Sequence, residues 1–245
     1  MPGALLEVHG VTKRFGGFVA LDGVDLVVQQ GERLGLIGPN GSGKSTLVNC
    51  ICGALRNDEG SVRFEGREIG TQPAHRRIRL GLARSFQIPK PFASMSVLDN
   101  LRVPLLYAAN AHAEKRLSES EVTDEAMRIL DRMGLAAKAR AKSGGLTQVE
   151  MRKLELARAM AAKPKLLFSD EAMAGLSPFE VDEILALLFG LREQGVAVIM
   201  IEHVMRAVMK FSDRVAVLVA GRKIADGDPQ AVVSIPEVVK AYLGE

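Results

Sequence analysis

The sequence lacks any long run of apolar residues. No stretch among its 245 residues approaches the ~20 consecutive apolar residues that a helix needs to cross a bilayer. Its start does not resemble a signal peptide, and internal repeats and low-complexity linkers are absent. We therefore expect a soluble, cytoplasmic protein that reaches a membrane only through a partner. The composition, 47% hydrophobic and 25% charged, is that of a globular chain with a sizeable core.

Basic clusters and cysteine are also scarce. The net charge is +3, and no block of Lys and Arg or basic stripe with interleaved aromatic residues occurs, so the composition does not favour a nucleic-acid partner. The two cysteines, Cys50 and Cys52, lie two residues apart on a predicted helix and therefore point in different directions. We expect small core residues there, and neither a disulfide nor a metal-binding pair.

A phosphate-loop pattern, G-x-x-x-x-G-K-[ST], follows an apolar run at residues 34–37 and precedes a predicted helix at 45–51. Its glycines let backbone N–H groups surround phosphate oxygens, and the helix points its positive end at them. Lys44 is expected to reach the β- and γ-phosphates, and the Ser45 hydroxyl to take a Mg²⁺ position. A chance match in a Gly-rich turn would not need this strand and helix. The predicted nucleotide-binding residues here are Gly38, Pro39, Asn40, Gly41, Ser42, Gly43, Lys44, Ser45 and Thr46.

Strand and helix patterns alternate through much of the chain, which predicts an α/β fold with a parallel sheet covered by helices. The stretch from about 88 to 162 differs, because it shows amphipathic helices and no strand pattern. Ser96 and Thr147 begin capping-box patterns within it. We predict a helical subdomain inserted into a core of about 1–87 and 163–245. Strands are expected at 5–8, 21–28, 31–37, 61–64, 68–69, 165–169 and 196–201, and a hairpin at 215–219 and 222–225.

Acidic residues and a histidine follow two of the predicted strands. Asp170 is expected to hold the Mg²⁺ shell and Glu171 to orient or deprotonate the attacking water, the alternative being an acidic helix cap. His203 ends the next strand, and the carboxyl ends of parallel strands share one edge, so it can contact the γ-phosphate. Gln87, at the entrance to the helical insert, can touch Mg²⁺ or water. The expected catalytic residues are thus Lys44, Gln87, Glu171 and His203.

The order of phosphate loop, Gln87, helical insert, Asp170-Glu171 and His203 resembles the nucleotide-binding domain of ABC ATPases over nearly the whole chain. This resemblance implies a P-loop NTPase fold, with a RecA-like core carrying N-terminal antiparallel β strands. It implies ATP and Mg²⁺ as cofactors. It also implies that Phe15 stacks on adenine, where a core Phe is the alternative, and that residues 174–177 cross a dimer interface.

Four shorter segments resemble one subgroup of ABC ATPases. Residues 82–87, 95–101, 152–158 and 241–244 are similar to the ATP-binding subunits of branched-chain amino acid importers, and to those of urea and amide importers. The resemblance implies transmembrane permease subunits, a second nucleotide-binding subunit (the same chain or a paralogue), and a periplasmic or extracellular solute-binding protein. It implies a peripheral position on the inner face of the cell membrane. Residues 88–92 are the expected docking segment, or else an ordinary Pro-rich loop.

The sequence departs from this family at its signature, which is usually Leu-Ser-Gly-Gly-Gln. Residues 146–150 read Leu-Thr-Gln-Val-Glu instead, and Ser143 lies three residues out of register. We expect Thr147 to supply the working hydroxyl, because it caps a helix whose N-terminus would point at the partner's ATP. Val149 hinders close approach of a phosphate, which predicts a weakened composite site. Ala172 stands where the family usually has Pro, and Ser169 is polar in a strand that is normally apolar.

Other classes of nucleotide-binding protein fit less well. Non-transport ABC ATPases usually carry two cassettes or a long coiled-coil insertion, and the sequence shows neither. A GTPase would need an Asn-Lys-x-Asp element, which is absent, and a kinase would not need Gln87 and His203 at these positions. A module that holds ATP without hydrolysing it is less easily set aside, given the altered signature.

Overall fold

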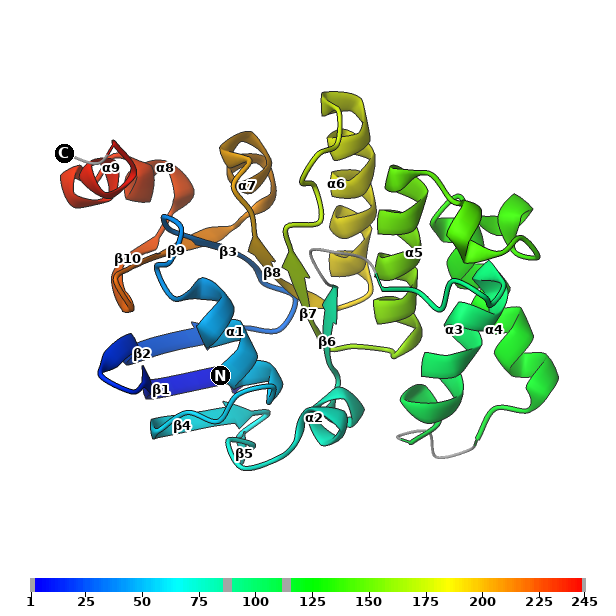
Figure 1. The fold of residues 1–245 in the computed structure, drawn as a ribbon, viewed down its shortest axis with the longest axis horizontal. Helices are drawn as coiled ribbons and strands as arrows, with labels where there is room; N and C mark the ends of the chain where they lie inside the picture. The colour runs from blue at the N-terminus through cyan, green and yellow to red at the C-terminus, as the bar shows by residue number, and fades with distance from the viewer. Residues whose placement is uncertain (1–2, 86–89, 112–115, 244–245) are drawn as a thin grey trace.

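A six-stranded sheet forms the centre of the molecule in the computed structural model, which describes residues 3–85, 90–111 and 116–243 (Figure 1). Its strand order is β10-β9-β3-β8-β7-β6, and all neighbours are parallel except the β9–β10 hairpin. The parallel strands carry continuous apolar runs because both faces of the sheet are covered. The strands are β3 (Arg33–Ile37), β6 (Leu82–Ser85), β7 (Leu166–Asp170), β8 (Ala197–Ile201), β9 (Arg214–Val219) and β10 (Arg222–Gly227).

A four-stranded antiparallel sheet of order β2-β1-β4-β5 lies beside it. Its strands are β1 (Leu6–Phe15), β2 (Phe18–Val28), β4 (Glu59–Phe64) and β5 (Arg67–Glu68). The first strand runs well beyond the predicted residues 5–8, since one face of an antiparallel sheet can meet water and so tolerates polar residues. The predicted α/β fold with N-terminal antiparallel strands is confirmed.

Helix α1 (Lys44–Cys52) packs between the two sheets (Figure 1). Leu47 and Ile51 are buried in one core with residues of both sheets, and Cys50 is buried there as a free thiol. Gly53, in the left-handed conformation, ends the helix. The buried guanidinium of Arg77, on α2 (Ala74–Leu80), donates to the carbonyls of Cys50 and Ile51 at 2.7 Å each, so it satisfies the helix end.

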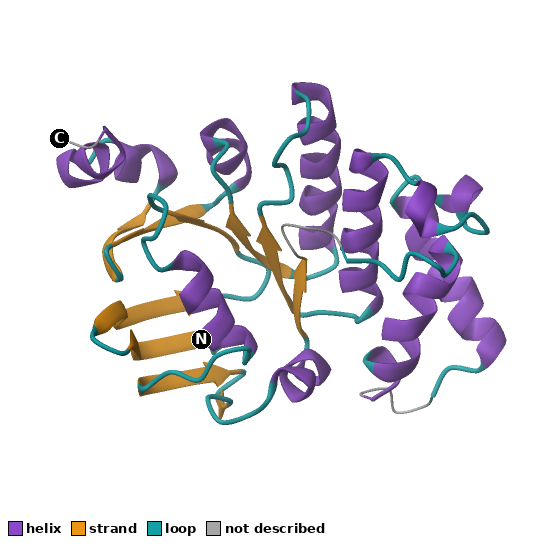
Figure 2. Ribbon diagram, in the orientation of Figure 1, coloured by secondary structure: helices purple, strands orange, loops and turns teal. Residues whose placement is uncertain are grey.

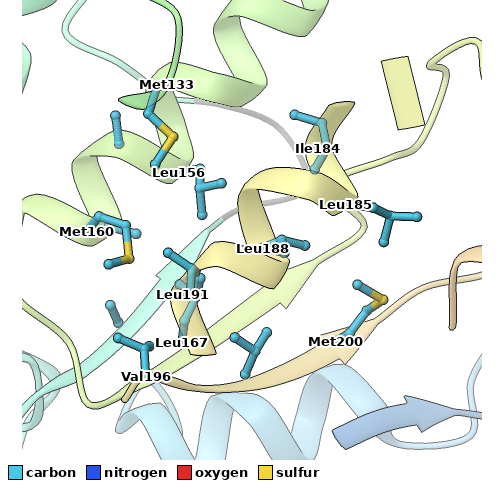
Figure 3. Close-up of a cluster of buried hydrophobic side chains, with 14 of the residues drawn as sticks. Met133, Leu156, Met160, Leu167, Ile184, Leu185, Leu188, Leu191, Val196 and Met200 are labelled. Carbon is cyan, nitrogen blue, oxygen red and sulfur yellow. The ribbon is translucent and has the colours of Figure 1, made fainter. Parts of the chain in front are cut away.

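Helices α5 (Gln148–Ala161), α6 (Pro178–Glu193) and α7 (Met205–Phe211) cover the other face of the central sheet. A second core joins them to β7 and β8, and Figure 3 shows its side chains interleaving. Ser177 caps α6 with a capping box, and Pro178 occupies the first turn. The labelled members of this core are Met133, Leu156, Met160, Leu167, Ile184, Leu185, Leu188, Leu191, Val196 and Met200.

The described residues between β6 and β7 form mainly helices, and Figure 2 shows these helices gathered at one end of the molecule. Apart from one isolated bridge between Ser96 and Lys142, its described residues contain no strand pairing. Thr147 forms the full predicted capping box with Glu150. Ser96 accepts the Asp99 N–H, but the Asp99 carboxylate bonds the Ser96 hydroxyl rather than its backbone. The elements are α3 (Val97–Tyr107), η1 (Ala109–Ala111), α4 (Glu119–Arg132), η2 (Ala136–Lys138), η3 (Ser143–Gly145) and α5.

Two short helices, α8 (Pro229–Val233) and α9 (Pro236–Leu243), follow the β9–β10 hairpin at the end of the chain. None of the helices in the described part of the chain has the length and apolar character needed to span a bilayer.

Candidate nucleotide-binding and hydrolysis site

The phosphate loop connects β3 to α1 and needs its glycines. Gly38, Gly41 and Gly43 have φ of 148°, 76° and 105°, where side chains are strained. A Cβ on Gly38 would lie 2.0 Å from the Leu218 carbonyl, and one on Gly43 would lie 2.7 Å from the Ala20 carbonyl. The backbone conformation, together with strand β9 at Gly38 and strand β2 at Gly43, therefore leaves room only for glycine at these two positions.

Lys44 folds back over this loop. Its Nζ donates to the carbonyls of Gly38 at 2.7 Å and Pro39 at 3.0 Å, and to Ser42 Oγ at 3.4 Å. Burial lowers the pKa of this ammonium, while the carboxylates of Glu171 and Asp170 act in the opposite direction. The loop thus holds a desolvated cation at the place where a phosphate chain would meet it.

A concave pocket of about 280 Å³ brings together most of the predicted nucleotide residues, but Gly38, Pro39 and Thr147 are not among the residues that line it. Phe15 is 49% exposed, so it is not a core residue, and the Lys13 Nζ lies over its ring at 5.5 Å from the centroid. Phe18 lines the same pocket with 64% exposure, and sequence reasoning missed it. The described residues that line the pocket are Phe15, Phe18, Ala20, Asn40, Gly41, Ser42, Gly43, Lys44, Ser45, Thr46, Glu171 and His203.

Glu171 and His203 meet at the carboxyl edge of the central sheet. The His203 Nε2 lies 2.9 Å from the Glu171 Oε1. Their strands β7 and β8 are neighbours, and the Glu171 N–H donates to the Ile201 carbonyl at 2.8 Å. A carboxylate and an imidazole in contact beside a phosphate loop can orient water and transfer a proton.

Asp170 is the last residue of β7, and its buried carboxylate is bound by a side chain of the neighbouring strand. Arg84 on β6 donates to Asp170 Oδ2 at 2.5 Å and to Asn49 Oδ1 on α1 at 2.6 Å. This contact ties the predicted metal carboxylate to the phosphate-loop helix, and sequence reasoning missed it. The hydroxyl of Ser45 and the carboxylate of Asp170 are hard oxygen donors of the kind that Mg²⁺ takes, so this pair fits the metal. Gln87, the other predicted metal residue, lies outside the described residues.

The two hydroxyls considered for the signature have different surroundings. Ser143 is fully buried, donates to the Phe92 carbonyl at 3.0 Å and accepts from Asn100 at 3.4 Å. Thr147 is exposed at the N-cap of α5, where its Oγ1 accepts the Glu150 N–H at 3.4 Å. Ser143 is therefore committed to the local fold, whereas Thr147 faces solvent at a helix N-terminus. The predicted role of the Thr147 hydroxyl at the partner's ATP stays a prediction.

The loop after Glu171 is attached to α5. The Ala174 carbonyl accepts from Gln148 Nε2 and from Arg152 Nη2, each at 3.4 Å. Gln148 occupies a position where the signature usually has glycine, so this link depends on the altered signature. A Cβ on Gly175 would lie 2.8 Å from Gln148 Nε2, which shows how closely the two segments approach.

Ser169, in β7, is a buried polar residue whose hydroxyl makes no hydrogen bond to the described residues. It borders a cavity of about 10 Å³ that Ser85, Arg152 and Glu155 also line. Leu156, Ala172, Ile184 and Leu188 complete its lining, and its volume is close to the smallest that a water molecule can occupy.

Comparisons with known proteins identify the family of this chain. A family model described as "ABC transporter" matches residues 21–174. The chain belongs to the ABC transporter family. A second model, "Branched-chain amino acid ATP-binding cassette transporter", matches residues 222–245 of this cassette. The predicted family, the ATP-binding function and the ATPase class are confirmed, whereas the roles of single residues stay predictions.

Relatives match this ABC cassette along its whole length. It is 39% identical to the high-affinity branched-chain amino acid transport ATP-binding protein BraF of Pseudomonas aeruginosa, over 98% of both chains. It is 36% identical to the LivG protein of Escherichia coli, again over 98% of both. Crystal structures of a nucleotide-free ATP-binding cassette and of a cassette in its ADP conformation, both from ABC transporters, match it with TM-score 0.89 and 34% identity, covering 99% of this chain and all of theirs.

Proposed function

We propose that this chain is the ATP-hydrolysing subunit of a membrane importer for branched-chain or other hydrophobic amino acids. The pairing of Glu171 with His203 at 2.9 Å, across one pocket from Lys44, carries the hydrolytic part of the proposal. The likeness to BraF and LivG, and the C-terminal match at 222–245, support the solute class. A related urea or amide importer, or a non-transport ABC ATPase, is the alternative.

In the proposed mechanism, the protein positions ATP and the attacking water and stabilises the charge on the phosphates. Lys44 and the N–H groups of the phosphate loop would bind the β- and γ-phosphates, and Phe15 would stack on adenine. Bound Mg²⁺, held by Ser45, Asp170 and Gln87, would neutralise the phosphate charge. Glu171 would orient the attacking water and accept its proton, and His203 would contact the γ-phosphate.

We place a second nucleotide-binding subunit, the same chain or a paralogue, opposite this site. Each ATP would lie between one phosphate loop and the partner's Thr147. Support comes from the exposed N-terminus of α5, whose backbone N–H groups can bind an anion. The helical segment of about 88–162 would rotate as a unit against the core of 1–87 and 163–245.

The transmembrane permease would dock on a groove between α2, α3 and α5. It has a volume of about 370 Å³, and Ile78, Phe92 and Tyr107 line it with 41%, 44% and 72% exposure. Arg84 lines it too and also holds Asp170, so the groove is joined to the hydrolysis site by one side chain. Of the expected docking segment, 90–92 is described and 88–89 is not. This groove would face the inner side of the cell membrane, with a solute-binding protein on the outer side.

ATPase assays of the purified chain test the hydrolytic part. We expect turnover in the wild type and losses on the order of 10²-fold or more in Lys44→Ala and Glu171→Gln. Glu171→Gln should still bind ATP, because the phosphate loop is intact. ATP binding by the wild type without turnover would contradict the proposal and favour a regulatory module.

A further inference from the structure

Glu202 is a buried carboxyl group that the mechanism above does not use. It follows β8 directly, precedes His203 in the chain, and is 3% exposed. Full burial of an ionisable side chain is costly unless its oxygens find donors. The contacts of Glu202 therefore indicate what the group does.

The carboxylate of Glu202 reaches across to the neighbouring loop. Its Oε1 accepts the backbone N–H of Met173 at 2.9 Å, and Met173 is itself buried. Met173 comes two residues after Glu171, whereas Glu202 is adjacent to His203. The bond thus joins the loop that carries the general base to the loop that carries the γ-phosphate contact. It runs beside the direct contact between Glu171 and His203.

Four charged or polar groups surround this carboxyl. Burial raises the pKa of Glu202 to about 7, and the nearby Glu171 carboxylate adds to the rise. The N–H groups of Met173 and His203, and the guanidinium of Arg152 on α5, act in the opposite direction. Arg152 also donates to the Ala174 carbonyl, so both ends of this short loop segment are held by buried side chains.

We propose that Glu202 is a positioning residue for hydrolysis, which fixes the loop after Glu171 by binding the Met173 N–H. The inference rests on the proposed ATPase mechanism. Without this acceptor the buried N–H would lose its partner, and the loop would no longer hold Glu171 against His203. The ionised carboxylate accepts the N–H more strongly than the neutral acid does, so the clamp tightens as Glu202 loses its proton.

Hydrogen–deuterium exchange on the nucleotide-free chain tests the clamp without any need for ATPase activity. Glu202→Ala should increase exchange in a peptide covering 172–177 by about tenfold or more, the loss of one buried hydrogen bond. Glu202→Gln, which keeps an acceptor oxygen, should stay close to wild type at pH 6. Glu193→Gln, an exposed carboxyl at the end of α6, is the matched control. Unchanged exchange in Glu202→Ala would overturn the proposal.

Steady-state kinetics give the second arm, and they separate positioning from general stability. We expect Glu202→Ala to lower kcat about tenfold or more with KM for ATP changed less than about threefold, because the phosphate loop is untouched. The ratio of wild-type to Glu202→Gln kcat should rise as pH passes from 6 to 8, since only the wild type gains the charged acceptor. A flat ratio contradicts the proposal even if Glu202→Ala fails to fold. A wild type without turnover would instead refute the ATPase mechanism, and exchange would still decide the role of Glu202.

Discussion

Glu171 adopts a backbone conformation that few residues other than glycine adopt. Its φ of 47° lies in the left-handed region, at a typical cost of about 1–3 kcal/mol that the surrounding structure must offset. The Ile201 carbonyl and the clamp from Glu202 hold this bend from either side. The carboxylate of this strained residue contacts the His203 Nε2 at 2.9 Å, so the strain falls on the proposed general base.

The pKa of Glu202 makes a prediction about stability. Its pKa rises from an ordinary 4.5 to about 7 on folding, so the folded chain retains a proton that the unfolded chain has lost. The resulting stability is fully present below about pH 4.5 and is lost as pH rises through about 7. Glu202→Gln removes this loss, so we expect its free energy of unfolding relative to wild type to increase by about 2–3 kcal/mol from pH 5 to pH 8. Urea unfolding of both proteins at pH 5 and pH 8 measures this difference in the free energy of unfolding. A difference that is the same at both pH values would contradict a raised pKa of Glu202.

Phe15 makes a prediction about nucleotide affinity. Stacking of a base on an aromatic ring is worth about 1–3 kcal/mol, so Phe15→Ala should raise KM for ATP about tenfold and leave kcat within about twofold. Phe15→Tyr keeps the ring and is the matched control. An equal rise in KM for both variants would show that the ring does not stack on the base.

The sequence predicted the residues that belong to local motifs, but it did not predict contacts between residues that lie far apart along the chain. Lys44 and Glu171 were predicted because a strand, a loop and a helix follow one another along the chain. The pair of Arg84 and Asp170 was not, because its members lie 86 residues apart and meet only through the pairing of β6 with β7. Glu202 was overlooked for the same reason, since its partner Met173 belongs to the neighbouring strand's loop.

At the scale of elements, α5 depends on its cap at Thr147. Thr147→Ala should cost about 1 kcal/mol of stability through the lost cap, and lower kcat about tenfold if the hydroxyl contacts the partner's phosphate. Thr147→Ser keeps the hydroxyl and should stay near wild type. Ser143→Ala, which alters only buried contacts, should destabilise the chain without a comparable loss of kcat. A greater loss of kcat from Ser143→Ala would overturn the predicted register.

The boundaries of β8 were predictable because both faces of this strand are buried, whereas the short strand β6 was not predicted. The predicted 196–201 differs from β8 by one residue, since its apolar run leaves no other position for the strand. Strand β1 was predicted too short, because its polar half from His9 to Arg14 carries no continuous apolar signal. Its pairing with β2 and β4, not its own pattern, extends it.

At the scale of the whole molecule, the proposed permease groove makes a prediction about assembly. Tyr107→Ser should reduce binding of the chain to vesicles that contain the permease by about tenfold, since a central exposed aromatic is a typical anchor. ATPase activity of the isolated chain should not change. Val239→Ser, on α9 and 39% exposed, is the control outside the groove. Equal binding by both variants would contradict the docking site.

The most direct test of the account is the size of Glu171→Gln in solution with and without ATP. This variant keeps the phosphate loop and Thr147 but loses the proposed general base, so bound ATP should persist between two subunits. We predict a monomer without nucleotide and a dimer with ATP, and Lys44→Ala should remain monomeric in both conditions. A Glu171→Gln chain that stays monomeric while ATP is bound would contradict a composite site built from two copies of this chain.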